Sequence, residues 1–177
     1  MALINTTTTG VLGSTFFGDG SGDLTVQKDG VTVNKITAAP AFSAGPSATQ
    51  SISAATWTKM QYNTEEWDTN NNYDNATNYR FTPTVAGYYQ INGCAESTGN
   101  SASGYFLVAV YKNGSAFKYG QNYKSDSASG PSASVATLVY FNGTTDYIEL
   151  YSIGQNAWTR GNNLVASYFQ ASLIRAA

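Results

Sequence analysis

The segment from Phe81 to Ile91 constrains the fold of this chain more than any other part of the sequence. It predicts a short strand, a turn and a second strand that begins immediately after Gly87. Two further turn signals follow, one at 112–114 and one at 141–146, and a closing strand pattern covers 168–174. Strands in this order, joined by tight turns, predict an antiparallel β-sandwich.

The composition is typical of short strands joined by tight turns. Charged residues make up 11% of the chain and aromatic residues 14%, with thirteen tyrosines, while Gly, Ser, Thr and Asn are abundant. A chain of 177 residues is long enough for one self-sufficient domain with an appendage. We expect residues 1–37 to form an N-terminal β arm and residues 38–177 to form the sandwich domain.

The N-terminal arm has its own strand pattern. Leu24 and Val26 alternate with polar residues before a turn signal at 28–30, and Val31 and Val33 alternate after it. This pattern predicts a short β-hairpin. Because an isolated hairpin is only marginally stable in water, we expect these four apolar residues to anchor the arm on the body, on a neighbouring subunit or on a larger assembly.

Charge and residue usage exclude several function classes. The net charge is −2, and the nine Lys and Arg residues are scattered singly, which is unsuited to nucleic acid. No apolar run approaches the roughly 20 residues of a membrane-spanning helix, and the N-terminus lacks the features of a secretory signal. The sequence has no histidine and one cysteine, Cys94, so it offers no Ser-His-Asp or Cys-His arrangement and no zinc site. We expect no cofactor, no metal and assembly in a cytosol.

Carboxylates are the remaining acid and base groups. Glu65, Glu66, Asp68 and Asp74 cluster in sequence, and a glycosidase can use two carboxylates held about 5 to 9 Å apart. The segment is rich in Asn, however, which favours solvated loop carboxylates, so we expect no enzymatic activity. A weak alternative is calcium held by this loop, although its spacing fits no EF-hand.

The same region is the best candidate for ligand binding. Trp67, Tyr73 and Trp158 can stack on the apolar faces of sugars, while Asp74 and Asn162 can hydrogen-bond to hydroxyl groups. These five residues are therefore the predicted ligand site, and the predicted ligand is a glycan. The alternative interpretation is that the tryptophans pack under loops or between subunits, since Trp side chains contribute large burial wherever they lie.

Period-two alternation predicts which side chains face the core of the sandwich. Tyr89 and Ile91 in one strand and Phe169 and Leu173 in another are assigned to the core, as are Ala136, Leu138 and Tyr140. The outer face of the same sheet then carries the opposite set: Tyr88, Val139, Phe141, Tyr168 and Ile174. A monomer would expose these residues as a patch, and large apolar patches usually mark interfaces, so we predict a permanent homo-oligomer. Scattered surface tyrosines are the other interpretation.

From Ala41 to Ile174 the chain resembles the ten-stranded jelly roll shared by the globular head of complement's first component and the tumour necrosis factor cytokines. The matching signatures are Ala41-Phe42-Ser43-Ala44, the segment 81–91, the turn at 112–114, the turn and strand at 141–150 and the exit strand at 169–174. The resemblance implies an all-β, ten-stranded antiparallel jelly-roll sandwich, here preceded by a short N-terminal β-hairpin arm. It also implies a homotrimer whose inner sheets pack about a threefold axis, through the face on which Tyr88 and Ile174 were placed.

The chain has no collagen-like stalk and no cytokine-type membrane anchor. Its Asn- and Thr-rich composition and N-terminal hairpin look more like the bacteriophage versions of this fold. That resemblance implies a non-enzymatic virion structural protein, a homotrimeric capsid decoration, cement or head-knob protein of a tailed phage, assembled in the host bacterial cytoplasm. Its partner would be the major capsid protein or a tail or head appendage protein. The alternative is the receptor-binding tip of a tail or head fibre that recognises host surface glycans.

Overall fold

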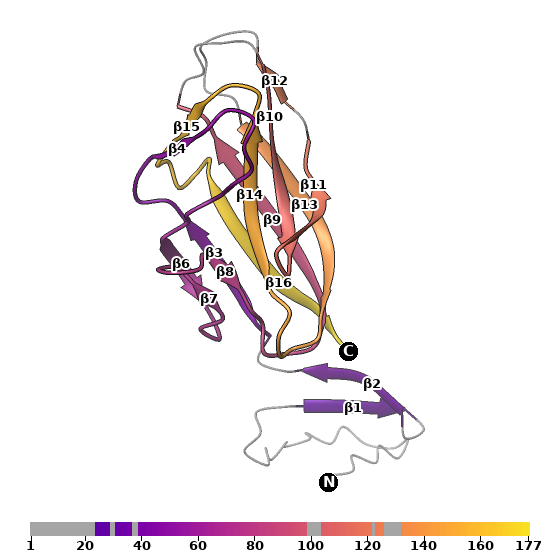
Figure 1. Ribbon diagram of the computed structural model, residues 1–177. Coiled ribbons are helices and arrows are strands. Elements are labelled where there is room, and N and C mark those ends of the chain that lie inside the picture. The colour runs from indigo at the N-terminus through magenta and orange to yellow at the C-terminus, as the bar shows by residue number, and fades with distance from the viewer. Residues whose placement is uncertain (1–23, 29–30, 37–38, 99–103, 122, 126–131) are drawn as a thin grey trace. The chain divides into compact units, whose positions relative to one another are not determined.

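The computed structural model describes residues 24–28, 31–36, 39–98, 104–121, 123–125 and 132–177. The chain divides into two compact units, Met1–Ala38 and Ala39–Ala177. In the first unit, β1 (Leu24–Lys28) pairs antiparallel with β2 (Val31–Ile36), and Figure 1 shows both strands. The predicted hairpin is therefore confirmed in its backbone. The turn expected at 28–30 lies partly outside the described residues, and the anchoring role of its four apolar residues stays a prediction.

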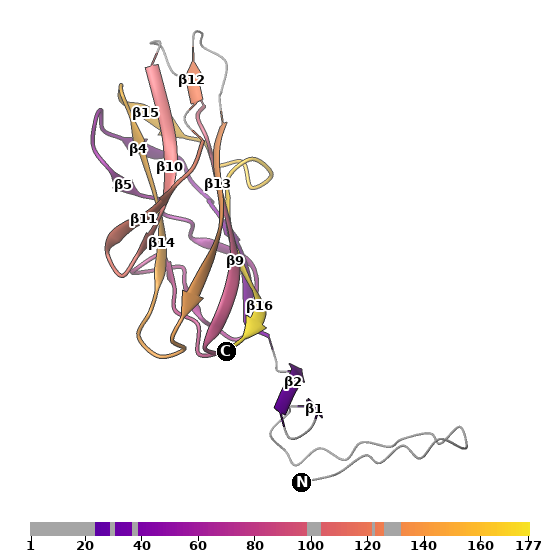
Figure 2. The ribbon, with the colours of Figure 1, turned by 90° about the vertical axis from the view of Figure 1, so that its right-hand side faces the viewer.

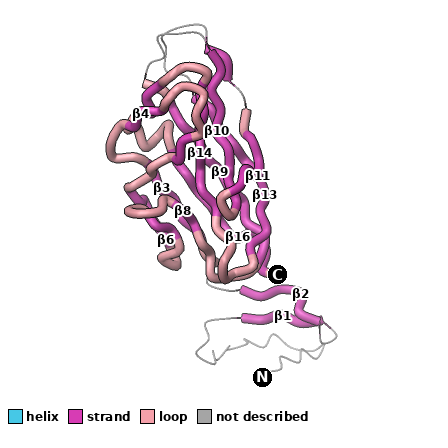
Figure 3. The backbone as a smooth tube through the Cα atoms, in the orientation of Figure 1, coloured by secondary structure: helices cyan, strands magenta, loops and turns pink. Residues whose placement is uncertain are grey.

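The second unit is built from strands and loops in the part of the chain that the structure describes (Figure 3). Among these residues there is no helix long and apolar enough to cross a membrane. The strands are β3 (Ala41–Gly45), β4 (Gln50–Ile52), β5 (Thr58–Lys59), β6 (Thr64–Asp68), β7 (Tyr73–Asp74), β8 (Arg80–Phe81), β9 (Gly87–Glu96), β10 (Gly104–Lys112), β11 (Ser115–Tyr119), β12 (Tyr123–Ser125), β13 (Ser132–Phe141), β14 (Ile148–Gly154), β15 (Trp158–Arg160) and β16 (Tyr168–Ala176).

Two antiparallel sheets form the layers of a sandwich. A five-stranded sheet has the order β13-β9-β16-β3-β6, and a seven-stranded sheet has the order β11-β10-β14-β8-β7, with β12 beside β10 and β5 beside β14. Figure 2 shows β13, β9 and β16 on one side and β11, β10 and β14 on the other. The short strands β4 and β15 pair separately. The predicted antiparallel jelly roll is confirmed, and the count exceeds ten because several strands have only two or three residues.

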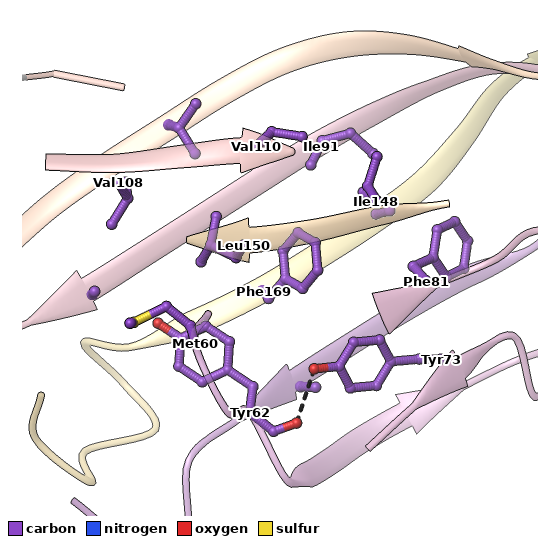
Figure 4. Packing of buried hydrophobic residues seen from close by; sticks show 14 of the residues in the cluster. Met60, Tyr62, Tyr73, Phe81, Ile91, Val108, Val110, Ile148, Leu150 and Phe169 are labelled. Carbon is purple, nitrogen blue, oxygen red and sulfur yellow. Dashed lines mark hydrogen bonds between the residues drawn. The ribbon is translucent and has the colours of Figure 1, made fainter. Parts of the chain in front are cut away.

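Aromatic side chains fill the centre of the core. The ring of Phe42 stacks on Tyr73 and Phe81, with centroids 4.5 and 4.7 Å apart, and meets the Phe169 ring edge-on at 5.1 Å. Apolar residues from both sheets surround these rings, and Figure 4 shows how closely they pack. The core residues predicted for β9 and β16 are confirmed, since Tyr89, Ile91 and Phe169 are buried and Leu173 packs against the core. Ile148 and Leu150 of β14 and Ala171 of β16 are buried as well.

The predicted face assignment of β13 is wrong. Val139 and Phe141 are buried in the core, whereas Leu138 and Tyr140 are exposed. The pairing register explains the difference, because directly opposite residues of paired strands share a face. Val139 lies opposite Tyr89, whose ring is in the core, and the Phe141 ring is 5.1 Å from that of Tyr89. Val139 and Phe141 are therefore core residues and lie away from any surface interface.

A tight turn joins β13 to β14. The side-chain Oδ1 of Asn142 accepts hydrogen bonds from the backbone N–H groups of Thr144, Thr145 and Asp146, each at 3.0 Å. Gly143 has a φ of 73°, in the left-handed region that favours glycine. A Cβ at this position would lie 2.5 Å from the backbone nitrogen of Ala86. Glycine is therefore required here both by its backbone angle and by the space available.

Replacing Gly143 with alanine should lower the free energy of unfolding more than the same change at Gly114. Both glycines have a positive φ, which costs an alanine about 1–2 kcal/mol. At Gly114 the nearest atom to an added Cβ is the Tyr147 hydroxyl at 3.5 Å, an ordinary contact. At Gly143 the backbone must also shift, at a further cost of about 1–3 kcal/mol. Urea denaturation measures both variants, and equal losses would contradict the steric argument.

Candidate functional site

Four large apolar side chains lie exposed on the outer face of the five-stranded sheet, and we call them the apolar patch. They are Tyr88 in β9, Leu138 and Tyr140 in β13, and Ile174 in β16, each between 43% and 62% exposed. Tyr88 lies directly opposite Tyr140, and their rings are 5.4 Å apart. Ile174 is at a bulge of β16, between the residues that pair with Tyr89 and Tyr88. The three strands thus gather these side chains at one end of the sheet.

Beside the apolar patch, this face carries polar side chains that are hydrogen-bonded to one another. The Gln170 side chain donates to Ser43 Oγ at 3.0 Å, and the Ser43 hydroxyl donates to the carboxylate of Glu66. On β9, the amide of Gln90 donates to the side-chain oxygen of Asn92 at 3.2 Å. An apolar area beside a polar, hydrogen-bonded area is the arrangement found in protein interfaces, where the polar part forms the rim.

The interface residues expected from the sequence are only partly on this face. Tyr88 and Ile174 belong to the apolar patch, and Tyr168 is half-buried opposite Cys94, toward the other end of β9. Val139 and Phe141 lie in the core, as described above. Leu138 and Tyr140 replace them on the surface; sequence alternation had assigned both to the core.

Comparisons with known proteins bear on the fold. No protein-family model matches the chain, and no curated protein matches its sequence. Solved structures do match: murine APRIL at 9% identity and a TM-score of 0.58, covering 77% of this chain and 99% of that one. The globular domain of zebrafish complement 1qA matches at 15% identity with a TM-score of 0.56, and the match covers 78% of this chain and 99% of that one. The Eiger TNF from S. frugiperda matches at 9% identity with a TM-score of 0.59, and the match covers 78% of this chain and 93% of that one.

The chain has the jelly-roll fold of these proteins. At such low identities the similarity establishes the fold alone, and the resemblance read from the sequence is confirmed to that extent. The matched share of this chain agrees in size with the unit Ala39–Ala177, which holds both large sheets.

In this TNF-like jelly roll the residues predicted to bind a glycan do not form one surface. Tyr73 is in the core, where its hydroxyl donates to the Tyr62 carbonyl at 2.9 Å (Figure 4). Trp158 is buried against Phe106, with ring centroids 4.8 Å apart. Trp67 is exposed on β6, which lies well away from β15 and Trp158 in Figure 1. The prediction that Tyr73 and Trp158 stack on a sugar is therefore wrong, because both rings are already covered by protein.

The acidic residues of this segment hold turns of the jelly roll together. Asp74 accepts hydrogen bonds from the backbone N–H groups of Ala76, Thr77 and Asn78, at 2.9 to 3.1 Å, and from the Asn78 side chain at 2.6 Å. Asp68 accepts one from the backbone N–H of Tyr73 at 2.7 Å. Within the described ranges, three or more acidic or Cys residues nowhere gather closely enough to hold a metal ion. Asn162 is exposed in the loop after β15.

The role of Asp74 can be tested through pH. The backbone N–H of Thr77, followed by the Asn78 amide and further backbone N–H groups, lowers the pKa of Asp74 to about 2. A carboxyl group whose pKa is lowered on folding stabilises the protein above its unfolded pKa of about 4, and this stabilisation is lost as the pH falls toward 2. We expect Asp74→Asn to lower the free energy of unfolding at pH 7 and to flatten its decrease between pH 4 and 2, measured by urea denaturation.

Glu65 provides a control of opposite sign. Its partial burial, and then the nearby charge of Asp68, raise the pKa of its carboxyl group. Glu65→Gln should therefore leave the loss of stability in acid at least as steep as in the unmodified protein. If Asp74→Asn leaves the decrease in the free energy of unfolding between pH 4 and 2 unchanged, the proposed role of the ionised Asp74 carboxylate in stabilising its turn is wrong.

Proposed function

We propose that this protein is a non-enzymatic homotrimer that associates through the outer face of the five-stranded sheet and decorates or cements the particle of a tailed bacteriophage. The observation that supports the oligomer is the apolar patch, formed by Tyr88, Leu138, Tyr140 and Ile174. Large apolar side chains grouped on neighbouring strands are unusual on soluble monomers and mark interaction surfaces. A structural role is supported by the acidic residues, since Asp68 and Asp74 are engaged with backbone N–H groups of their own turns.

The energetics favour a permanent assembly. Obligate interfaces bury about 2,000 Å² or more, which at about 25 cal/mol per Å² contributes tens of kcal/mol gross. Association costs about 4 to 15 kcal/mol, so burial of this size leaves a large surplus. The hydrogen-bonded polar area around Ser43 and Gln170 can remain as the wetter part of such an interface.

The oligomer is tested first by the mass of the full chain in solution. Static light scattering on the purified protein should give three times the 18.8 kDa of one chain, unchanged on dilution to low micromolar concentration. A mass of one chain would end the proposal. A dimer mass would keep the interface but contradict the threefold arrangement.

The N-terminal unit is proposed to attach the protein to the particle. Hairpins of two strands are marginal alone, so β1 and β2 need a surface to stabilise them, and the major capsid protein or an appendage protein would supply it. Removing residues 1–38 should leave a trimer of the jelly roll that no longer joins particles, measured by co-sedimentation. If the shortened protein still joins them, the anchoring role of Leu24, Val26, Val31 and Val33 is wrong.

The location on the particle separates decoration from host attachment. An antibody against this chain, imaged on native particles by electron microscopy, should label the capsid lattice if the protein decorates or cements it. Label confined to the tail would favour the alternative, a receptor-binding tip that recognises surface glycans of the host. The absence of label from every particle would contradict both virion roles and leave a free trimeric protein.

A further inference from the structure

A second group of aromatic side chains lies on the other sheet, and we call it the aromatic cluster. It consists of Trp57, just before β5, Tyr111 in β10, Tyr119 in β11 and Tyr151 in β14. The rings of Tyr111 and Tyr151 stack with centroids 4.0 Å apart and planes inclined by 24°. Trp57 stacks on Tyr119 at 5.4 Å and 11°, and lies 5.8 Å from Tyr111. The four rings therefore form one continuous group.

The aromatic cluster is on the outer face of the seven-stranded sheet. Val108 and Val110 of β10 are buried in the core, so the intervening Ala109 faces outward. Ala109 lies opposite Tyr119 on one side and opposite Tyr151 on the other. It is fully buried although it faces outward, which indicates that the rings of its cross-strand neighbours, Tyr119 and Tyr151, cover its methyl group. The four rings form two stacked pairs, and the planes of Trp57 and Tyr111, which connect the pairs, are inclined by 59°.

The rings of the cluster are both open to solvent and held in place. Tyr119 is 62% exposed, while Trp57, Tyr111 and Tyr151 are half-buried. Each ring rests on a neighbour, so little side-chain entropy remains to be lost when a ligand binds. Rigid aromatic rings that stay exposed are efficient contact surfaces for this reason.

An ion pair lies beside the aromatic cluster. Lys59 lies opposite Tyr151 and Glu149 lies opposite Tyr111, and the ammonium and carboxylate groups of these two residues form an ion pair at 2.5 Å. Arg80 lies opposite Glu149 on the other side of β14, and its guanidinium is 4.6 Å from the centroid of the Tyr147 ring, outside the cluster. The charges nearest the four rings are therefore paired with each other. This favours a neutral ligand.

We propose that the aromatic cluster is a binding site for neutral glycans. The face of an aromatic ring is electronegative and attracts groups with partial positive charge, such as the C–H groups on the apolar face of a pyranose. The phenol groups of the tyrosines and the partly exposed ammonium of Lys59 can hydrogen-bond to hydroxyl groups at the edge of the sugar. An open surface of this kind, on which one ring is largely exposed, binds each sugar weakly.

This inference does not depend on the proposed trimer. The aromatic cluster and the apolar patch lie on opposite sheets, and Figure 2 shows these as separate layers. A trimer formed through the five-stranded sheet would leave the cluster accessible in three copies, which strengthens attachment to a surface that displays many sugars. The site also shares no residue with the ligand set expected from the sequence.

The experiment uses the full chain and beads that carry neutral oligosaccharides of glucose, galactose or N-acetylglucosamine, with beads of glucuronate oligosaccharides for comparison. We expect retention on at least one neutral surface and none on glucuronate. Tyr119→Ala should weaken retention about 10-fold or more, as expected for one lost stacking contact. Because Tyr119 is largely exposed, the variant should keep its melting temperature. Trp67→Ala removes an exposed tryptophan from the other sheet and should change nothing.

Tryptophan fluorescence gives a second measurement. In a Trp67→Phe background the remaining tryptophans are Trp57 and the buried Trp158, so addition of the retained oligosaccharide should change the emission of Trp57. Retention on no neutral surface would overturn the proposal, as would equal retention of Tyr119→Ala and the unmodified protein. Loss of binding in Trp67→Ala, or retention on glucuronate alone, would also overturn it. Each of these outcomes is independent of the mass that tests the trimer.

Discussion

Replacing Tyr88 with aspartate is expected to leave the protein as monomers in solution. Tyr88 lies in the middle of the apolar patch, between Tyr140 on β13 and Ile174 on β16. In the proposed trimer a carboxylate at this position would be buried without a partner, at a cost of about 3–5 kcal/mol for each copy. Because a trimer contains three copies, the concentration needed for assembly rises by several orders of magnitude.

The mass of the variant, measured by light scattering, checks this expectation. Ile174→Asp should have the same effect, since Ile174 belongs to the same patch. Tyr119→Asp is the matched control, because it places the same charge on an exposed tyrosine of the opposite sheet and should leave the mass unchanged. If Tyr88→Asp and Ile174→Asp both keep the mass of the unmodified trimer, the interface lies elsewhere.

Truncation of Arg160 should produce a large loss of stability in the jelly roll. The side chain is almost fully buried, and its Nη1 donates to the carbonyl of Gly161 at 2.7 Å. Its Nη2 donates to the carbonyls of Ala48 at 3.0 Å and Gln61 at 3.4 Å. Arg160→Ala would leave a cavity and unpaired buried carbonyls, so we expect the free energy of unfolding to fall by about 3–5 kcal/mol.

Urea denaturation measures the change in the free energy of unfolding, and two further variants serve as controls. Lys118→Ala removes an exposed cation from β11, in the other sheet from the apolar patch, and should cost less than about 0.5 kcal/mol. Arg160→Lys should recover only part of the loss, because one ammonium group cannot reach three carbonyls in the geometry of the planar guanidinium. A loss of under about 1 kcal/mol for Arg160→Ala would contradict the stabilising role of the hydrogen bonds from this side chain to the three carbonyls.

The sequence predicted strand faces well where the two alternating sets of residues differ in polarity. In β9, Tyr89 and Ile91 alternate with Gln90 and Asn92, and the structure buries the first pair, as expected. In β13 both sets contain bulky apolar residues, so alternation alone cannot choose between them. The choice is made by pairing with β9, which places Val139 beside Tyr89, and this register is a tertiary property.

The candidate ligand residues were misplaced for a related reason. Tyr73 is in a strand of two residues, too short to show a period, and its ring is drawn into the core by Phe42. Trp158 is covered because β15 pairs with β4 and packs on Phe106, contacts between segments far apart in the sequence. The aromatic cluster is equally non-local: Trp57 and Tyr119 come together only once β5, β14, β10 and β11 are in place.

The place of β16 has a consequence for how the chain folds during synthesis. This strand lies between β9 and β3 in the five-stranded sheet, yet it is the last of the strands to leave the ribosome. Until then one edge of β3 and one edge of β9 have unpaired backbone groups, which can pair with another nascent chain. The sheet can close only after every strand of the jelly roll has been synthesised, and its long-range pairings make that step slow. Association between copies of this protein is therefore expected to follow synthesis of the complete jelly roll.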